Sequence, residues 1–247
     1  MKIVVFDLDE TLGYFSELGM FIDCLHNNHQ ISQKEFNEIL DLYPEFIRPN
    51  IINILNYLKK KKISNACSKI MIYTNNQGPK SWAEQIIAYF ETKIHYKLFD
   101  QIVCAFKING KQIELNRTTH DKTHSDFIRC TQIPENTQIC FLDDVYHPDM
   151  ANDNIYYINI KPYVHDLPID EMISRFSNTE MKDKLKHDFS DYKYTPKEPE
   201  DLDIDVILGK SIMSHLKLFF SKNNANKSAK SKRFTRKKTS KTHNTNV

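Results

Sequence analysis

The amino-acid sequence predicts an α/β fold with a doubly wound parallel sheet. Three apolar runs carry this prediction, at residues 2–6, 69–73 and 137–142, and each is followed by small polar or acidic residues. Runs without regular polar alternation are typical of central parallel strands that helices cover on both faces. Helical patterns separate the runs, as the crossover connections of a parallel sheet require.

The elements between these runs follow from apolar spacing and from capping residues. Apolar residues at helical spacing predict two short helices in 14–46, which are too small to form a core of their own. We therefore interpret 14–46 as a small helical cap insertion that lies over the sheet edge. Pro49 favours the first turn of a helix over 51–62, and Ser81 is a candidate N-cap for a helix that reaches Phe90.

The second half of the chain continues the alternation of strands and helices. The elements predicted there are a strand over 99–106, a hairpin turn at Asn109-Gly110, a helix over 124–131 and a strand over 155–160. Residues 178–205 are highly charged and contain Pro196 and Pro199, so we expect a loosely packed charged arm. An apolar pattern over 206–220 predicts a final helix that docks on the body of the protein.

The composition indicates one globular domain with a basic extension. A chain of 247 residues with 40% hydrophobic content can bury a sizeable core, and we assign residues 1–222 to a single domain. Residues 223–247 are rich in Lys, Ser, Thr and Asn, which predicts a disordered tail. From Ser221 onward there are nine basic residues and no acidic one, so the rest of the chain has 25 basic against 32 acidic residues. The tail is compatible with a nuclear localisation signal, with a weak and salt-sensitive contact to nucleic acid, or with a solubilising extension.

The sequence also excludes several classes of protein. No stretch approaches the roughly 18 apolar residues that a membrane span needs, and the charged residues near the start exclude a signal peptide. The five cysteines lack CxxC spacing, which indicates reduced thiols and no zinc site. We therefore expect an intracellular protein, cytoplasmic or nuclear, without a membrane partner.

Acidic and hydroxyl side chains follow the three apolar runs. Asp7 and Asp9 follow the first run, Thr74 follows the second, and the pair Asp143-Asp144 follows the third. The carboxyl ends of parallel strands lie along one sheet edge, where ligands bind in folds of this class. Two carboxylates at positions i and i+2 there can hold a divalent cation or divide the roles of nucleophile and acid.

With these motifs in this order, the sequence resembles the haloacid dehalogenase (HAD) superfamily over residues 1 to about 160. The matching features are DxDxT from Asp7 to Thr11, a threonine at the end of the second strand, an upstream lysine and the acidic pair. The resemblance implies that Asp7 is the nucleophile, which forms an aspartyl-phosphate, and that Asp9 is first the acid and then the base. It also implies that Thr74, with Asn75 beside it, binds a phosphoryl oxygen of the substrate.

The resemblance further implies a Mg²⁺ site. Carboxylates gathered around a phosphate require a cation, and an oxygen-rich site suits Mg²⁺ better than zinc. The implied ligands are Asp7, the backbone carbonyl of Asp9 and Asp144, with Asp143 and Asp149 in supporting positions.

A lysine that neutralises the phosphoryl group completes the set of motifs. Lys122 precedes the acidic pair by one helix and one loop, which is the interval usual in the family. We therefore predict Lys122 as a catalytic residue. Lys107 and Lys80 are the alternatives.

Two branches of the superfamily imply different substrates. The opening FDLDETL is similar to the branch of the NLI-interacting factors and RNA polymerase C-terminal-domain phosphatases, whose open site admits a phosphorylated protein segment. Residues 74–78, TNNQG, instead resemble the polynucleotide 3′-phosphatases and histidinol-phosphate phosphatases. A short cap favours a large or flexible substrate, because a small metabolite usually needs a lid.

The expected function is therefore that of a phosphomonoesterase acting on a phosphorylated protein or small molecule. A polynucleotide 3′-phosphatase, or another nucleic-acid-associated hydrolase, is one alternative. A non-catalytic binding module of the same fold is the other, although such a module would have lost an acid, and Asp7, Asp9 and Asp144 are all present.

Overall fold

The computed structural model describes residues 1–25, 31–185 and 194–221, and its centre is a five-stranded sheet. In spatial order the strands are β3 (Gln101–Val103), β2 (Lys69–Tyr73), β1 (Lys2–Phe6), β6 (Gln138–Asp143) and β7 (Ile155–Asn159). Every neighbouring pair is parallel. The predicted α/β class with a parallel sheet is confirmed, and the arrangement is Rossmann-like.

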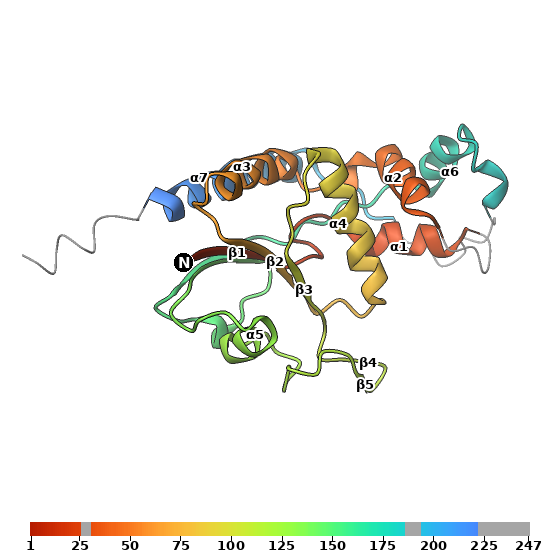
Figure 1. The fold of residues 1–247 in the computed structure, drawn as a ribbon. Coiled ribbons are helices and arrows are strands. Elements are labelled where there is room, and N and C mark those ends of the chain that lie inside the picture. The colour runs from red at the N-terminus through yellow and green to blue at the C-terminus, as the bar shows by residue number, and fades with distance from the viewer. Residues whose placement is uncertain (26–30, 186–193, 222–247) are drawn as a thin grey trace, which may run out of the picture.

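Helices flank the sheet on both faces, with α3 and α7 on one side and α5 on the other (Figure 1). The α-helices are α1 (Phe15–Asp23), α2 (Gln33–Leu42), α3 (Ile51–Ile63), α4 (Lys80–Ile94), α5 (His124–Thr131), α6 (Ile169–Ser177) and α7 (Pro199–Ser221). Short 3₁₀ helices are η1 (Pro44–Phe46), η2 (Pro148–Met150) and η3 (Lys182–Lys184). In the described part of the chain, no helix combines the length and apolar character of a membrane span.

The central strand divides its side chains between two apolar cores. Val4 and Phe6 of β1 belong to the larger core, which α1 to α4, α6 and α7 cover. Ile3 and Val5 point to the opposite face and pack in a smaller core with Phe127 of α5. Because side chains alternate along a strand, an uninterrupted apolar run is needed to fill both cores.

Residues 14–46, predicted as a cap insertion, pack into the larger core. Phe15 of α1 and Phe36 of α2 are fully buried there, and α2 packs against α4. Phe36 meets the ring of Trp82 edge to face, with ring centroids 5.5 Å apart. The two helices therefore lie beside the sheet edge as part of the same continuous core.

Two element boundaries in the middle of the chain differ from the sequence prediction. The strand predicted over 99–106 ends at Val103, and a separate antiparallel hairpin follows, formed by β4 (Lys107–Ile108) and β5 (Lys111–Gln112). The predicted turn between them is confirmed, because Asn109 and Gly110 both have positive φ, as a two-residue hairpin turn requires. Pro79 rather than Ser81 is the N-cap of α4, and its side chain makes no capping hydrogen bond.

The C-terminal third contains more helix than the sequence pattern predicted. α7 begins at Pro199, not at 206, because proline is tolerated in the first turn, where Glu200 and Asp201 also favour a helix start. α6 had no predicted counterpart and buries Met172 and Phe176. The charged arm predicted over 178–205 lies partly outside the described residues, as does the whole tail predicted over 223–247.

Candidate functional site

The candidate site lies at the carboxyl edge of the sheet, around β1. The order of the strands reverses there, since β2 and β6 flank β1 on opposite sides, and such a switch point is where α/β sheets bind ligands. Asp7 directly follows β1, Thr74 follows β2, and Asp143 ends β6. Of the predicted site residues, all but Asp149 line one cleft of about 370 Å³, namely Asp7, Asp9, Thr74, Asn75, Lys122, Asp143 and Asp144.

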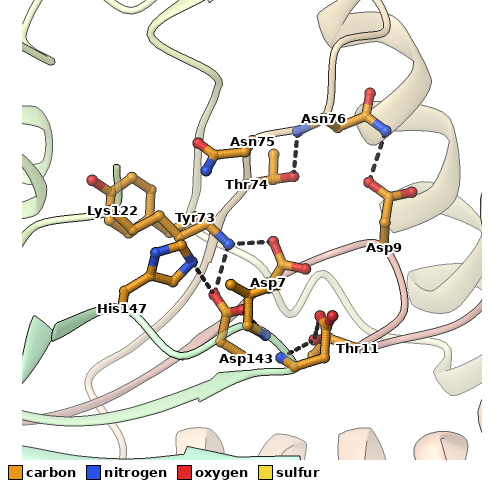
Figure 2. Close-up of polar contacts among 12 residues, drawn as sticks. Asp7, Asp9, Thr11, Tyr73, Thr74, Asn75, Asn76, Lys122, Asp143 and His147 are labelled. Atoms are coloured by element: carbon orange, nitrogen blue, oxygen red, sulfur yellow. Dashed lines mark hydrogen bonds and ion pairs between the residues drawn. The ribbon is translucent and has the colours of Figure 1, made fainter. Parts of the chain in front are cut away.

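Lys122 joins the ends of two strands. Its Nζ lies 2.5 Å from Asp7 Oδ1 and 2.7 Å from Asp143 Oδ2, and all three side chains are buried (Figure 2). Burial alone would lower the pKa of Lys122, but the two carboxylates outweigh burial and raise it, so the ammonium stays charged. The alternatives lie elsewhere: Lys80 starts α4 and pairs with Glu84, and Lys107 of β4 lies over a phenylalanine ring.

Three carboxylates form a cluster that fits a divalent cation. Asp7, Asp143 and Asp144 each offer one oxygen, and these oxygens lie within 4.8 Å of one another. When all three are ionised, Lys122 offsets one of the three negative charges, and a divalent cation would neutralise the other two. Burial raises the pKa of Asp7 to about 7, Lys122 opposes this rise, and Asp143 adds to it. The donor set is all oxygen, as Mg²⁺ prefers.

The carboxylate of Asp9 points away from this cluster. Its Oδ2 accepts a 2.7 Å hydrogen bond from Asn76 Nδ2, at the end of the cleft opposite His147 (Figure 2). Burial raises the pKa of Asp9 to about 6, although the Asn76 bond lowers it, and the charge of Asp7 contributes to the rise. A carboxyl group with a pKa near neutrality is suited to giving and taking a proton. Asp149 is exposed on η2 and lies outside the carboxylate cluster.

Other polar residues at the site had no predicted role. Thr11 Oγ1 donates to Asp144 Oδ1 at 2.9 Å and accepts from the Asp144 backbone N–H at 3.2 Å, which ties the loop after β1 to the acidic pair. His147 Nε2 lies 3.6 Å from Asp143 Oδ2. Burial lowers the pKa of His147 to about 4, so this imidazole is neutral at physiological pH.

Two buried arginines hold the loops that carry the site. Arg117 donates to the backbone carbonyls of Thr74 and Cys104 at 3.2 and 2.9 Å, and to those of His120 and Asp121 at 3.0 and 3.1 Å. It thereby fastens the end of β2 to the loop that presents Lys122. Sequence reasoning missed Arg117, because donors to backbone carbonyls leave no side-chain motif.

Arg48 fastens the other side of the site in the same way. It donates to the backbone carbonyls of Thr11 at 2.7 Å and Lys161 at 2.9 Å, and also to that of Glu10. The arginine is 1% exposed and directly precedes Pro49 and the N-cap of α3. The start of α3 thus positions the loop that follows Asp7.

Comparisons with protein-family models, with curated proteins and with solved structures found no match. Function is therefore inferred from the residues of the site.

Proposed function

We propose that this chain is a magnesium-dependent phosphomonoesterase that works through an aspartyl-phosphate on Asp7. The observation that supports this most strongly is the set of three carboxylates with Lys122 between two of them, at a switch point of a parallel sheet. The HAD resemblance of the DxDxT and DD motifs assigns the same residues.

The proposed reaction has two steps. An Asp7 carboxylate oxygen attacks phosphorus while the bond to the ester oxygen breaks, and Asp9 gives its proton to the departing oxygen. A water molecule then attacks the aspartyl-phosphate and loses a proton to the Asp9 carboxylate, which releases inorganic phosphate and restores both acids. The pKa of Asp9, raised to about 6, supports its change of role at neutral pH.

The remaining residues bind charge. Thr74 is buried at the end of β2 and lines the cleft with Asn75, where both can donate hydrogen bonds to phosphoryl oxygens. Lys122 supplies a fixed positive charge next to the nucleophile, which offsets the charge that develops during transfer. Asp7, Asp143 and Asp144 would hold Mg²⁺, which when bound supplies electrostatic stabilisation of the phosphoryl group.

The test is hydrolysis of p-nitrophenyl phosphate in Mg²⁺ and in EDTA. We expect Mg²⁺-dependent turnover that falls at least about a thousandfold in Asp7→Asn, which removes the nucleophile with little change of shape. The matched control is Asp153→Asn, an exposed aspartate in the turn before β7, which should keep full activity. Circular dichroism verifies that each variant is folded. Equal turnover in EDTA, undiminished activity of Asp7→Asn, or no turnover by folded wild-type protein would each overturn the proposal.

A further inference from the structure

A second cavity, of about 650 Å³, opens from the catalytic cleft beside Asp9. The two spaces share Asp9, Ser16 and Asn76 as lining residues. Lys122 is not among the residues that line the second cavity. Its volume falls within the roughly 300–1,000 Å³ that small-molecule sites occupy.

The walls of this cavity are mostly apolar and come from α1 and α4. Phe15 and Gly19 line it from α1, and Trp82 lines it from the first turn of α4. A Cβ placed on Gly19 would lie 3.6 Å from the Trp82 indole, so a side chain longer than alanine there would meet the ring. The indole also contacts Phe36 edge to face. The volume and the mostly apolar lining of the cavity suit an apolar or aromatic group between α1 and α4.

The described lining of the cavity carries negative charge and no positive charge. Among the described residues that line it, the acidic ones are Asp9, which is protonated when it acts as the acid of the proposed reaction, and Asp23, which is exposed at the end of α1. No Lys, Arg or His belongs to the described lining. A ligand with a second negative charge would be repelled here, whereas a positive charge would be attracted.

We propose that this cavity binds the alcohol part of the substrate, and that the substrate is a small phosphomonoester whose alcohol is largely apolar or aromatic and carries a positive charge. The proposal rests on the proposed function, because Asp9 protonates the departing oxygen and lines both spaces, so the group attached to that oxygen leaves beside the second cavity. A polynucleotide is disfavoured as substrate, because its further phosphates would bring negative charge next to Asp23.

Two aromatic phosphoesters of almost the same shape test the charge preference. Tyramine O-phosphate carries an ammonium group and 4-(phosphonooxy)phenylacetate carries a carboxylate, while both release a substituted phenol. We expect kcat/KM at least tenfold higher for the cationic ester, and Asp23→Asn should bring this ratio towards one. A wild-type ratio of one or less, or a ratio that Asp23→Asn leaves unchanged, overturns the proposal.

The fluorescence of Trp82 gives a second readout that does not depend on turnover, because this is the single tryptophan of the chain. Trp82 is excited at wavelengths where tyrosine does not absorb. Its emission should change on titration with tyramine and should not change with 4-hydroxyphenylacetate. Gly19→Leu places a larger side chain against the indole in the wall of the cavity and should abolish the response. Gly19→Ala adds only an ordinary contact and is the folding control.

Together the two readouts separate the two proposals. A fluorescence response to tyramine without hydrolysis of any phosphoester would overturn the proposed catalysis and support the cavity assignment. Hydrolysis of both esters at equal rates, with no response of Trp82 to tyramine, would support the catalysis and overturn the cavity assignment.

Discussion

Replacement of Lys122 by methionine should destabilise the protein strongly, and more so at high pH. Lys122 is 2% exposed and pairs with Asp7 at 2.5 Å and Asp143 at 2.7 Å. Methionine fills a similar volume but leaves two buried carboxylates without their cation. Loss of one partner of a buried ion pair typically costs about 3–5 kcal/mol, which for a domain of this size lowers Tm by roughly 6–20 °C.

The pH dependence of this loss follows from the two carboxyl groups. The pKa of Asp7 is already raised from 3.8 to about 7, and that of Asp143 is raised too, and removal of Lys122 raises both further. The folded variant therefore keeps protons that the folded wild type releases as the pH rises. A folded state that keeps extra protons loses stability as the pH rises. The free energy of unfolding of the variant is therefore only slightly below that of the wild type near pH 5, and the difference is largest at pH 8.

The assay is thermal unfolding in EDTA, followed by circular dichroism at pH 5 and pH 8, which separates this effect from metal binding. Lys80→Met is the control, because this lysine is exposed and makes a 3.7 Å i,i+4 pair that contributes at most a few tenths of a kcal/mol. A deficit for Lys122→Met that is equal at the two pH values, or larger at pH 5, would refute the reasoning.

Two further substitutions test residues outside the carboxylate cluster. Burial, with the charge of Asp166 added, raises the pKa of Glu17 from 4.5 to about 8, so wild-type stability should fall between these pH values. Glu17→Gln keeps an acceptor for the Leu167 N–H and should be more stable than wild type by roughly 2–4 kcal/mol at pH 8.5 but not at pH 4.5, as urea unfolding measures. Arg117→Met removes the donor to four backbone carbonyls, including that of Thr74, and should lower the free energy of unfolding by at least about 3 kcal/mol. Arg117→Lys should recover only part of this loss, because lysine lacks the planar fork, and full recovery in urea unfolding would contradict the assignment.

The sheet and the edge that carries the candidate site were predictable because both depend on local patterns. Asp7 and Thr74 each directly follow an apolar strand, and Asp143 ends one, so the parallel topology alone brings them to one edge. Lys122 was predicted from its interval in the chain. Its contact with two carboxylates from different strands required the structure.

The rest of the site depends on tertiary contacts that leave no local signal. Asn76 bonds Asp9 only because the loop after β2 lies across from the loop after β1. Arg117 bonds backbone carbonyls, which every residue type offers equally. Likewise α6 is a short amphipathic helix, and its two buried residues Met172 and Phe176 were too few for the sequence to predict it.

The division between the sheet edge and the walls of the second cavity has a consequence for specificity. Most groups proposed for chemistry lie at the ends of β1, β2 and β6, in loops that two buried arginines hold. The groups proposed to select that alcohol lie on α1 and on the first turn of α4. Substitutions at Gly19 and Asp23, both on α1, should therefore change which phosphoester is preferred without moving Asp7 or Lys122. If these substitutions changed the preferred phosphoester and also lowered the Tm at pH 8, as loss of the Lys122 ion pairs would, the walls of the second cavity would be shown to affect the structure of the sheet edge.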